Sequence, residues 1–442
     1  MSNHSKNPRR KRATNNPDHS RRTHVSAPAD SEIEARLTEL VKPAVYAEME
    51  HYRRLGLRNR ILTLPVMVSL VLTLIWRRVP GVMELVRLVA RERVLWTAPQ
   101  SVSQPALSER LMTFPAELFQ HVLERVMAEL PARQALRTRP QPALFQRLRQ
   151  HFSGFYALDG STLEALFRKL KALQEQADAP LAGHIVAAVD LLTHLPAAVW
   201  WADDPSSNDK ALLPQVKPWL QASTLVVFDL GYFAFTWFDD LTESQVSFVT
   251  RLRAKTSYQV QESLRYHPQL RDQIVHLGNF RSNPSRHPVR LLEVFIDGEW
   301  RSYLTNVLDP AQLSLVDVVE LYEQRWQIES AFLLVKRLLD LAYLHVGSSN
   351  GVKLQLWATW LFYAVLIDLC DDVAEALHQP LDRISVEMVY RGLYHYTTAV
   401  ANGFVGDVPT YYLHHGRDLG LVKRIRPSAR PSPSAQIATF RD

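Results

Sequence analysis

Apolar residues recur at helical spacing along residues 31–149, where leucine, valine and methionine alternate with charged positions. Charged side chains such as Glu84, Arg87 and Arg91 fall three and four residues apart, which places them on one face of a helix. The pattern predicts a small helical domain over residues 30–150. Residues 1–29 are polar, basic and rich in Pro, Ser and Asn, and they predict a disordered arm.

Short apolar runs replace the helical spacing after Phe152. Runs of this length that are bounded by turn residues predict β-strands. The first three runs, at residues 155–159, 184–192 and 197–201, predict a meander of three strands. Four further elements are predicted: a helix over residues 206–221, a strand buried on both faces over 225–229, a helix or turn over 238–245 and a fifth strand over 246–252.

The next segment, from residue 253 to about 306, combines strand-like runs with turn clusters and predicts a β-rich insertion. Ser314 and Asp317 then form an S-x-x-D capping signature, which predicts the start of a long helix that runs to about Leu341. This order predicts an α/β fold, with a ribonuclease-H-like core that the insertion interrupts before the last catalytic helix. The predicted divisions are a first core part at 151–252, the insertion at 253–310, a second core part at 311–405 and a C-terminal tail at 406–442.

The net charge is concentrated at the N-terminus. The 442 residues carry a formal net charge of +6, and residues 1–25 contain seven Lys and Arg but a single acid, Asp18. The rest of the chain is neutral, so any contact with an acidic partner outside the arm must use local basic patches.

Cysteine content and apolar stretches bear on the compartment. The one cysteine, Cys370, excludes an intramolecular disulfide and predicts a reducing cytoplasm. The basic N-terminus lacks the apolar segment of a secretory signal. The apolar stretches at residues 61–76 and 354–367 are shorter than the ~20 residues that span a bilayer, so they predict buried helices.

Two predicted strands end in an aspartate with a glycine close behind it. Asp159 precedes Gly160, and Asp229 lies two residues before Gly231. A buried carboxylate without a partner is costly, and a metal ion is one partner that offsets the cost. The glycines permit the chain to turn away so that the carboxylates face outward. An acid at a strand end is also common as a turn or capping residue, so either aspartate alone leaves both interpretations open.

Four polar residues of the predicted long helix, Tyr322, Arg325, Glu329 and Lys336, are spaced three, four and seven apart. At about 100° per residue they fall on one narrow stripe, while apolar residues occupy other positions of the helix. That is not the pattern of an ordinary solvated face. The alternative is that Arg325 and Glu329 form an i,i+4 ion pair worth a few tenths of a kcal/mol.

The same segment, YEQRWQIESAFLLVK at residues 322–336, matches the Y-(2)-R-(3)-E-(6)-K signature of bacterial insertion-sequence DDE transposases. It resembles the group that cuts and pastes DNA through hairpins. The resemblance extends to YALDGSTL around Asp159, VVFDLGYF around Asp229 and YLTNVLD before the helix, and it covers roughly residues 100–370. The chain departs from such proteins at Leu230, where they commonly have arginine.

The resemblance implies an enzyme that cleaves DNA at the ends of an insertion sequence and transfers the freed strands into target DNA. It implies that Asp159, Asp229 and Glu329 are the catalytic residues. It also implies that they bind two Mg²⁺ or Mn²⁺ ions per active site, since hard cations prefer oxygen ligands. Two such ions stabilise the attacking and leaving oxygens of phosphodiester cleavage.

The resemblance also implies how DNA is held. Arg325 would bind phosphate oxygens through its fork of donors and Lys336 as a point charge, while Tyr322 would donate a hydrogen bond to the same backbone. The implied partners are double-stranded DNA, as terminal inverted repeats and as target, and a second copy of the chain in a dimeric synaptic complex. The implied location is the bacterial nucleoid.

The insertion is locally basic and aromatic. Residues 251–301 hold nine Lys and Arg against five acids, and five aromatic residues are interleaved with them. This composition predicts a DNA contact near the active site. Relatives that form hairpins flip a base onto an aromatic residue of this insertion, which makes Trp300 the candidate stacking platform. The alternative is that Trp300 packs in the small core of the insertion itself.

A second basic patch precedes the first predicted catalytic strand. Five arginines occur between Pro131 and Leu158 with no acid among them, and they predict phosphate contacts without sequence preference. A solvated linker is the alternative. The five are Arg133, Arg137, Arg139, Arg147 and Arg149.

Other functions find less support in the residues. A transposase-derived protein that is catalytically silent and represses by occupying the terminal repeats would not need three intact carboxylates. A glycosidase that uses Asp159 and Asp229 as paired carboxylates leaves the polar stripe at residues 322–336 without a role. One cysteine excludes a cysteine-rich zinc cluster, and the sixteen histidines contain no H-x-x-x-H pair with a third ligand.

Overall fold

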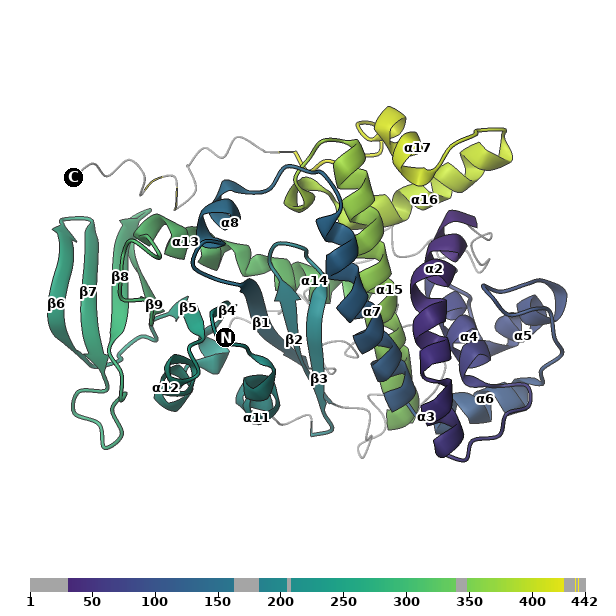
Figure 1. Ribbon diagram of the computed structural model, residues 1–442, viewed down its shortest axis with the longest axis horizontal. Helices are drawn as coiled ribbons and strands as arrows, with labels where there is room; N and C mark the ends of the chain where they lie inside the picture. The colour runs from purple at the N-terminus through teal and green to yellow at the C-terminus, as the bar shows by residue number, and fades with distance from the viewer. Residues whose placement is uncertain are drawn as a thin grey trace, which may run out of the picture.

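The computed structural model describes residues 31–162, 183–204, 208–338 and 348–424, together with residues 434 and 436. The predicted arm at residues 1–29 lies outside this range, as does most of the tail beyond residue 424. Helices occupy one end of the molecule and a large sheet occupies its middle and other end (Figure 1).

Helices fill the stretch where helical spacing predicted them. They are α2 (Ser31–Ala47), α3 (Met49–Arg54), α4 (Leu64–Trp76), α5 (Val82–Arg91), α6 (Gln104–Thr113), α7 (Glu117–Ala135) and α8 (Ala143–Leu148). α4, the first of the two apolar stretches, is buried on almost every face. Such a helix needs neighbours all round, and α2 and α15 (Ser349–Ala376) supply them.

One nine-stranded sheet contains all the strands of the described residues. They are β1 (Gly154–Thr162), β2 (His184–Asp190), β3 (Pro196–Ala202), β4 (Thr224–Phe228), β5 (Ser247–Arg251), β6 (Tyr258–His267), β7 (Leu270–Leu277), β8 (Val289–Ile296) and β9 (Glu299–Thr305). Their order is β3-β2-β1-β4-β5-β9-β8-β7-β6. The three strands predicted as a meander are antiparallel neighbours, and β4 and β5 follow them parallel to β1.

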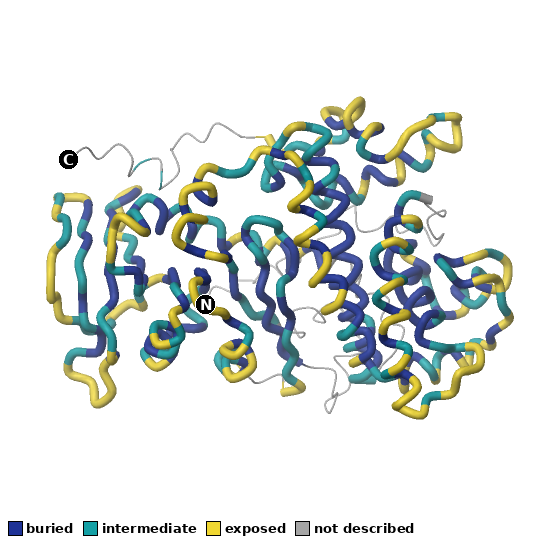
Figure 2. Tube along the Cα trace, in the orientation of Figure 1, coloured by how far each residue is buried: buried dark blue, intermediate teal, exposed yellow. Residues whose placement is uncertain are grey.

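The insertion shares its sheet with the core. Its last strand, β9, pairs antiparallel with β5, with Val249 opposite Thr305, and β8, β7 and β6 then extend the sheet outward. β6 at the far edge is largely exposed, whereas β8 in the interior of the insertion is mostly buried (Figure 2). The β-rich character was predicted, but the backbone ladder that joins the insertion to the core was not.

The predicted long helix is two helices, α13 (Leu315–Gln324) and α14 (Trp326–Leu338), which meet at Arg325. Its start is as predicted, because Ser314 and Asp317 form a reciprocal capping box. The prediction of one continuous helix was wrong at Arg325, where the amide of Ile328 bonds the Arg325 carbonyl in a tighter three-residue turn. Short helical turns, η1 (Asp209–Leu212), α11 (Leu213–Val216) and η2 (Lys217–Trp219), take the place of the helix predicted over 206–221.

α15 runs through the centre of the helical end, between α7, α4 and α17 (Val408–His415), and contains the second apolar stretch (Figures 1 and 2). Among the described helices it alone is long and apolar enough to cross a membrane, and 94% of its most apolar window is buried inside the protein. α16 (Val386–Ala401) packs on it near the C-terminal end of the described chain.

Four of the five arginines predicted as a phosphate-binding patch form ion pairs within the protein. Arg137 and Arg139 have side chains only 8% and 3% exposed, so these two are neither phosphate contacts nor part of a solvated linker. An ion-pair network at the C-terminal half of α15 binds them. Its members are Arg36 with Asp368 at 2.7 Å and with Asp372, Arg133 with Asp368 at 3.2 Å, Arg137 with Asp368 at 2.8 Å, with Asp371 at 2.9 Å and with Asp372, and Arg139 with Asp371. Arg147 instead pairs with Asp317 of α13 at 2.7 Å.

Candidate active site

Asp159 and Asp229 come from adjacent parallel strands. β1 and β4 pair with Leu158 opposite Phe228, so the next residue on each strand is the aspartate. The parallel pairing of the two strands stops just before the aspartates, which lie side by side there. β1 itself continues along β2 to Thr162, so the prediction that the first strand ends at residue 159 was wrong. The sequence pattern of an apolar run ending in Asp therefore places the two carboxylates close together.

The glycines after the two aspartates shape the local backbone. The Gly160 amide donates to Oδ1 of Asp159 at 2.8 Å, and the Gly231 amide donates to Oδ1 of Asp229 at 2.7 Å. Asp229 thereby caps the short helical turn η3 (Leu230–Tyr232), so the capping role considered for it is present. Each of these bonds uses one carboxylate oxygen, which is compatible with a second role for the other.

Arg325 connects the second part of the chain to this pair. Its Nη2 lies 2.7 Å from Oε1 of Glu329, and its Nη1 lies 3.8 Å from Oδ2 of Asp159. The i,i+4 ion pair therefore exists, but the same guanidinium also bridges to the first strand. α14, which carries Glu329, packs directly on β1. The guanidinium group of Arg325 thus connects two of the predicted catalytic residues, Asp159 and Glu329.

Tyr322 forms the other side of this arrangement. The Arg325 guanidinium lies over its ring at 5.7 Å, and the ring contacts Tyr303 of β9 at 5.4 Å. Lys336 lies in α14, seven residues (about two helical turns) beyond Glu329. Its side chain is outside the part of the chain that the structure describes. Tyr322, Arg325 and Glu329 therefore lie next to one another, as their spacing predicted, although the helix is interrupted at Arg325.

Asp209 is a fourth carboxylate at the site, and no motif in the sequence predicts its place there. It accepts a hydrogen bond at 2.7 Å from Nε2 of His184, whose side chain is 4% exposed. A Cβ on Gly160 would lie 1.9 Å from one Asp209 oxygen, and a Cβ on Gly231 would lie 2.5 Å from the other. The two glycines after the predicted aspartates therefore leave the room that Asp209 occupies.

The carboxylates affect one another's ionisation. Burial raises the pKa of Asp159 to about 7; the neighbouring charges of Asp229 and Asp209 add to this, and the Gly160 amide and Arg325 oppose it. Burial likewise raises the pKa of Asp229, and Asp209 and Glu329 contribute in the same direction. Crowded carboxylates of this kind are stabilised by a shared cation, which makes them candidates for a functional site.

The donor set fits a hard divalent cation. Asp159, Asp229 and Glu329 offer only oxygen, which Mg²⁺ and Mn²⁺ prefer. A buried tyrosine lies close to the acidic residues. Tyr232 is fully buried, and its hydroxyl has no hydrogen-bond partner among the described residues. Burial raises the pKa of this hydroxyl, and the negative charges of Asp209, Asp159 and Asp229 raise it further.

Basic side chains surround Leu230, the position at which the chain departs from the motif. Nη2 of Arg253 donates to the Leu230 carbonyl at 3.1 Å, and Nζ of Lys210 donates to the Phe233 carbonyl at 2.9 Å. Sequence reasoning had counted Arg253 only as part of the basic insertion and had not considered Lys210. An arginine is thus present beside residue 230 although none is at that position in the sequence.

Trp300 lies apart from the carboxylates. It is 39% exposed, contacts Phe295 of β8 at 5.6 Å and lies beneath the Arg271 guanidinium at 4.7 Å. Side chains alternate along a strand, so Trp300 is on the face of β9 opposite to Tyr303, which contacts α13. No contact described in the structure joins Trp300 to the acidic residues, and its aromatic neighbour is consistent with the alternative of local packing.

Comparison with known proteins shows that the segment carrying this site is similar to transposases. Residues 151–365 match the family described as "Transposase DDE domain", and that segment contains Asp159, Asp229 and Glu329. A curated protein of Sinorhizobium fredii (strain NBRC 101917 / NGR234), named "Putative transposase y4zB", is 28% identical over 155 residues. The match covers 33% of this chain and 43% of that relative, so the chain spans less than half of the relative's length. Both findings support a transposase function.

Proposed function

We propose that this chain is a cut-and-paste DNA transposase. It would cleave DNA at the ends of an insertion sequence and transfer the freed strands into target DNA. The observation that carries the proposal is the convergence of Asp159, Asp229 and Glu329, from two adjacent strands and a separate helix, around Arg325. The sheet order, in which three antiparallel strands precede two parallel ones, supports a ribonuclease-H-like core.

The three carboxylates would hold the divalent cations, Mg²⁺ or Mn²⁺, two per active site. When bound, such ions activate the attacking hydroxyl and stabilise charge on the phosphate and leaving oxygen. The protein's own contribution is positional. The Gly160 and Gly231 amides orient Asp159 and Asp229, and Arg325 holds Glu329. Fixed carboxylates place the reacting phosphate without reorganisation at the moment of cleavage.

DNA would be held by groups around this site. Arg325 and Tyr322 are stacked next to the carboxylates, and we assign them and Lys336 to the phosphates of the cleaved strand. Arg253 would supply the phosphate contact that Leu230 cannot make. Trp300 is proposed to stack on a base that leaves the duplex, at the exposed part of the insertion.

The proposed substrate complex contains two copies of the chain and two terminal repeats on the bacterial nucleoid. Incubating the full chain with the DNA ends of its own element and Mg²⁺ or Mn²⁺ is expected to give metal-dependent nicks and hairpins. Binding of these ends without cleavage under either metal would instead support the silent repressor. Products resolved on a denaturing gel distinguish the two, since a repressor leaves the strands intact.

Asp209→Asn is expected to weaken cleavage by about 10- to 100-fold, the usual effect of a group that orients metal ligands. The amide keeps the shape of the side chain and a polar contact with His184 but loses the charge next to Gly160 and Gly231. The Mn²⁺ concentration for half-maximal cleavage should rise. Asp240→Asn, which alters an exposed pair with Lys217, is the control. An unchanged metal requirement would limit Asp209 to a structural role.

A further inference from the structure

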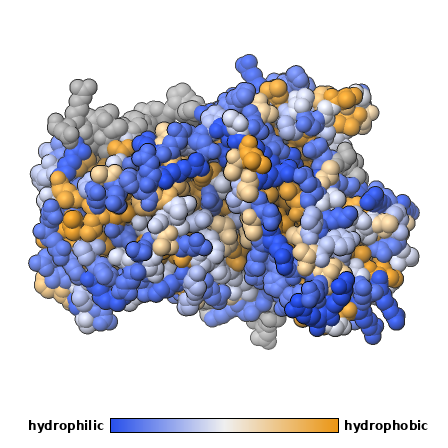
Figure 3. All heavy atoms as spheres, viewed as in Figure 1, coloured by the Kyte–Doolittle hydropathy of each residue, from blue (hydrophilic) through white to orange (hydrophobic). Residues whose placement is uncertain are grey.

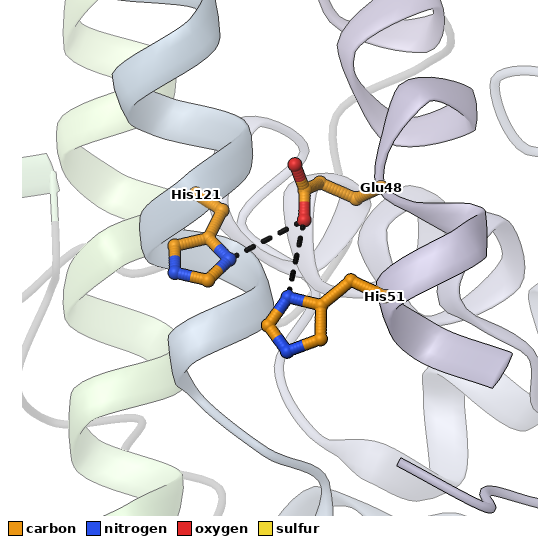
Figure 4. Close-up of side chains that lie close together, drawn as sticks. All are labelled: Glu48, His51 and His121. Carbon is orange, nitrogen blue, oxygen red and sulfur yellow. Dashed lines mark hydrogen bonds and ion pairs between the residues drawn. The ribbon is translucent and has the colours of Figure 1, made fainter. Parts of the chain in front are cut away.

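A second group of metal-ligating side chains lies at the other end of the molecule. Glu48 is between α2 and α3, His51 is in α3, and His121 is in α7, across the helix interface. Figure 4 shows both imidazoles directed at the same Glu48 oxygen. Nδ1 of His121 is 3.3 Å from Oε2 of Glu48, and Nδ1 of His51 is 3.5 Å from the same atom.

The spacing of these donors fits a tetrahedral ion. Bonds of about 2.0–2.2 Å from zinc to nitrogen and oxygen put neighbouring donor atoms about 3.4 Å apart. The two measured separations are close to this value, and all three donor atoms lie within 4.8 Å of one another. The two imidazole rings are stacked with centroids 5.0 Å apart, and the Nδ1 atom of each ring faces Oε2 of Glu48.

The surroundings also fit a cation. Glu48 is 4% exposed, while the two imidazoles are partly open to solvent, so an ion would have an entry path. The three residues line a cavity of about 630 Å³. Its wall also includes Glu50 and Glu124 and two arginines, of which Arg54 is paired with Glu50 and Arg125 with Glu48. The surface over α3 is strongly hydrophilic (Figure 3). Arg125 bonds the other Glu48 oxygen, Oε1, at 2.5 Å and leaves Oε2 to the imidazoles.

We propose that Glu48, His51 and His121 form a binding site for one divalent transition-metal ion of the zinc class. Two imidazoles and a carboxylate suit Zn²⁺ or Co²⁺ better than Mg²⁺, which prefers oxygen alone. Binding moves the ring proton of each histidine from Nδ1 to the solvent-facing Nε2, so no net proton need be released. The ion would fasten the α2–α3 junction to α7, and the site is independent of the proposed DNA chemistry.

Zn²⁺ titration of the full chain, in excess Mg²⁺ to occupy the acidic site, tests the proposal. One equivalent is expected to bind, and Co²⁺ in its place should give the visible absorption of a tetrahedral ion. His51→Gln and His121→Gln each retain a polar side chain and are expected to weaken binding by about 100-fold or more, because losing a ligand costs at least as much as losing a group that only orients one. His395→Gln, on an exposed part of α16, is the matched control.

Thermal unfolding provides a second measurement that does not depend on the variants folding equally well. Zn²⁺ should raise the midpoint for the wild type and for His395→Gln, because an ion that binds only the folded state stabilises it. It should raise the midpoints of both cluster variants, each compared with its own metal-free midpoint, clearly less than it raises that of the wild type. Absence of saturable binding in Mg²⁺, or equal binding and stabilisation in the cluster variants and the control, overturns the proposal.

Discussion

Glu329→Gln is expected to reduce metal-dependent cleavage of end DNA by about 10³-fold or more, because it removes a charge that holds the cations, and this is worth several kcal/mol in the transition state. Glutamine has nearly the same shape, so the packing of α14 on β1 should persist. DNA binding should remain, since the phosphate-binding groups are unchanged. Cleavage and gel-shift measurements on the same preparation separate the two effects.

Glu320→Gln on α13 is the matched control for this variant, since it changes a half-buried acid that pairs with Arg147 and not with Arg325. It should cleave at close to the wild-type rate. Full cleavage by Glu329→Gln would remove Glu329 from the catalytic set. If neither protein cuts DNA but both hydrolyse a glycoside, the paired-carboxylate alternative built on Asp159 and Asp229 would replace the transposase.

Asp368→Ala is expected to lower the free energy of unfolding by about 3–5 kcal/mol, the usual cost of removing one member of a buried ion pair. Asp368 is fully buried and forms ion pairs with three arginines, Arg36, Arg133 and Arg137. Its loss leaves these guanidinium groups with fewer partners in a place where water cannot replace them. Urea unfolding followed by circular dichroism measures the change.

Arg87→Ala is the control for the network, because it removes an exposed pair with Glu84 and should change stability by less than about 1 kcal/mol. A similarly small effect of Asp368→Ala would mean that water or a local rearrangement compensates the arginines. Arg137→Ala removes another member of the same network. The losses of unfolding free energy caused by Arg137→Ala and Asp368→Ala should not be additive in the double variant, because the two residues are in direct contact.

The strands that carry Asp159 and Asp229 could be predicted because their signal is local. A continuous apolar run that ends in Asp indicates a buried strand whatever lies elsewhere in the chain, although β1 continues beyond Asp159 to Thr162. The position of Arg325 could be predicted less well. Helical spacing located it on a stripe with Tyr322 and Glu329, but the break between α13 and α14 depends on packing against β1 and β9, which spacing does not encode.

Residues that meet only through the tertiary fold were missed. Asp209 follows a polar stretch that is typical of a surface turn, and its place between Gly160 and Gly231 is set by the path of the chain around the sheet. His121 is 70 residues from His51, so no short metal motif joins them. The arginines at 133–139 looked free because their acidic partners lie more than 200 residues away, on α15.

The shared ladder of β4, β5 and β9 has a mechanical consequence for the proposed reaction. A flap on a hinge could swing toward bound DNA, whereas a strand that is hydrogen-bonded into the central sheet keeps Trp300 and Asp229 on one rigid frame. The distance between Asp229 and Trp300 is then fixed before DNA binds. The duplex must therefore bend and unstack to fit the protein, and its deformability at the cleavage site becomes part of what the protein selects.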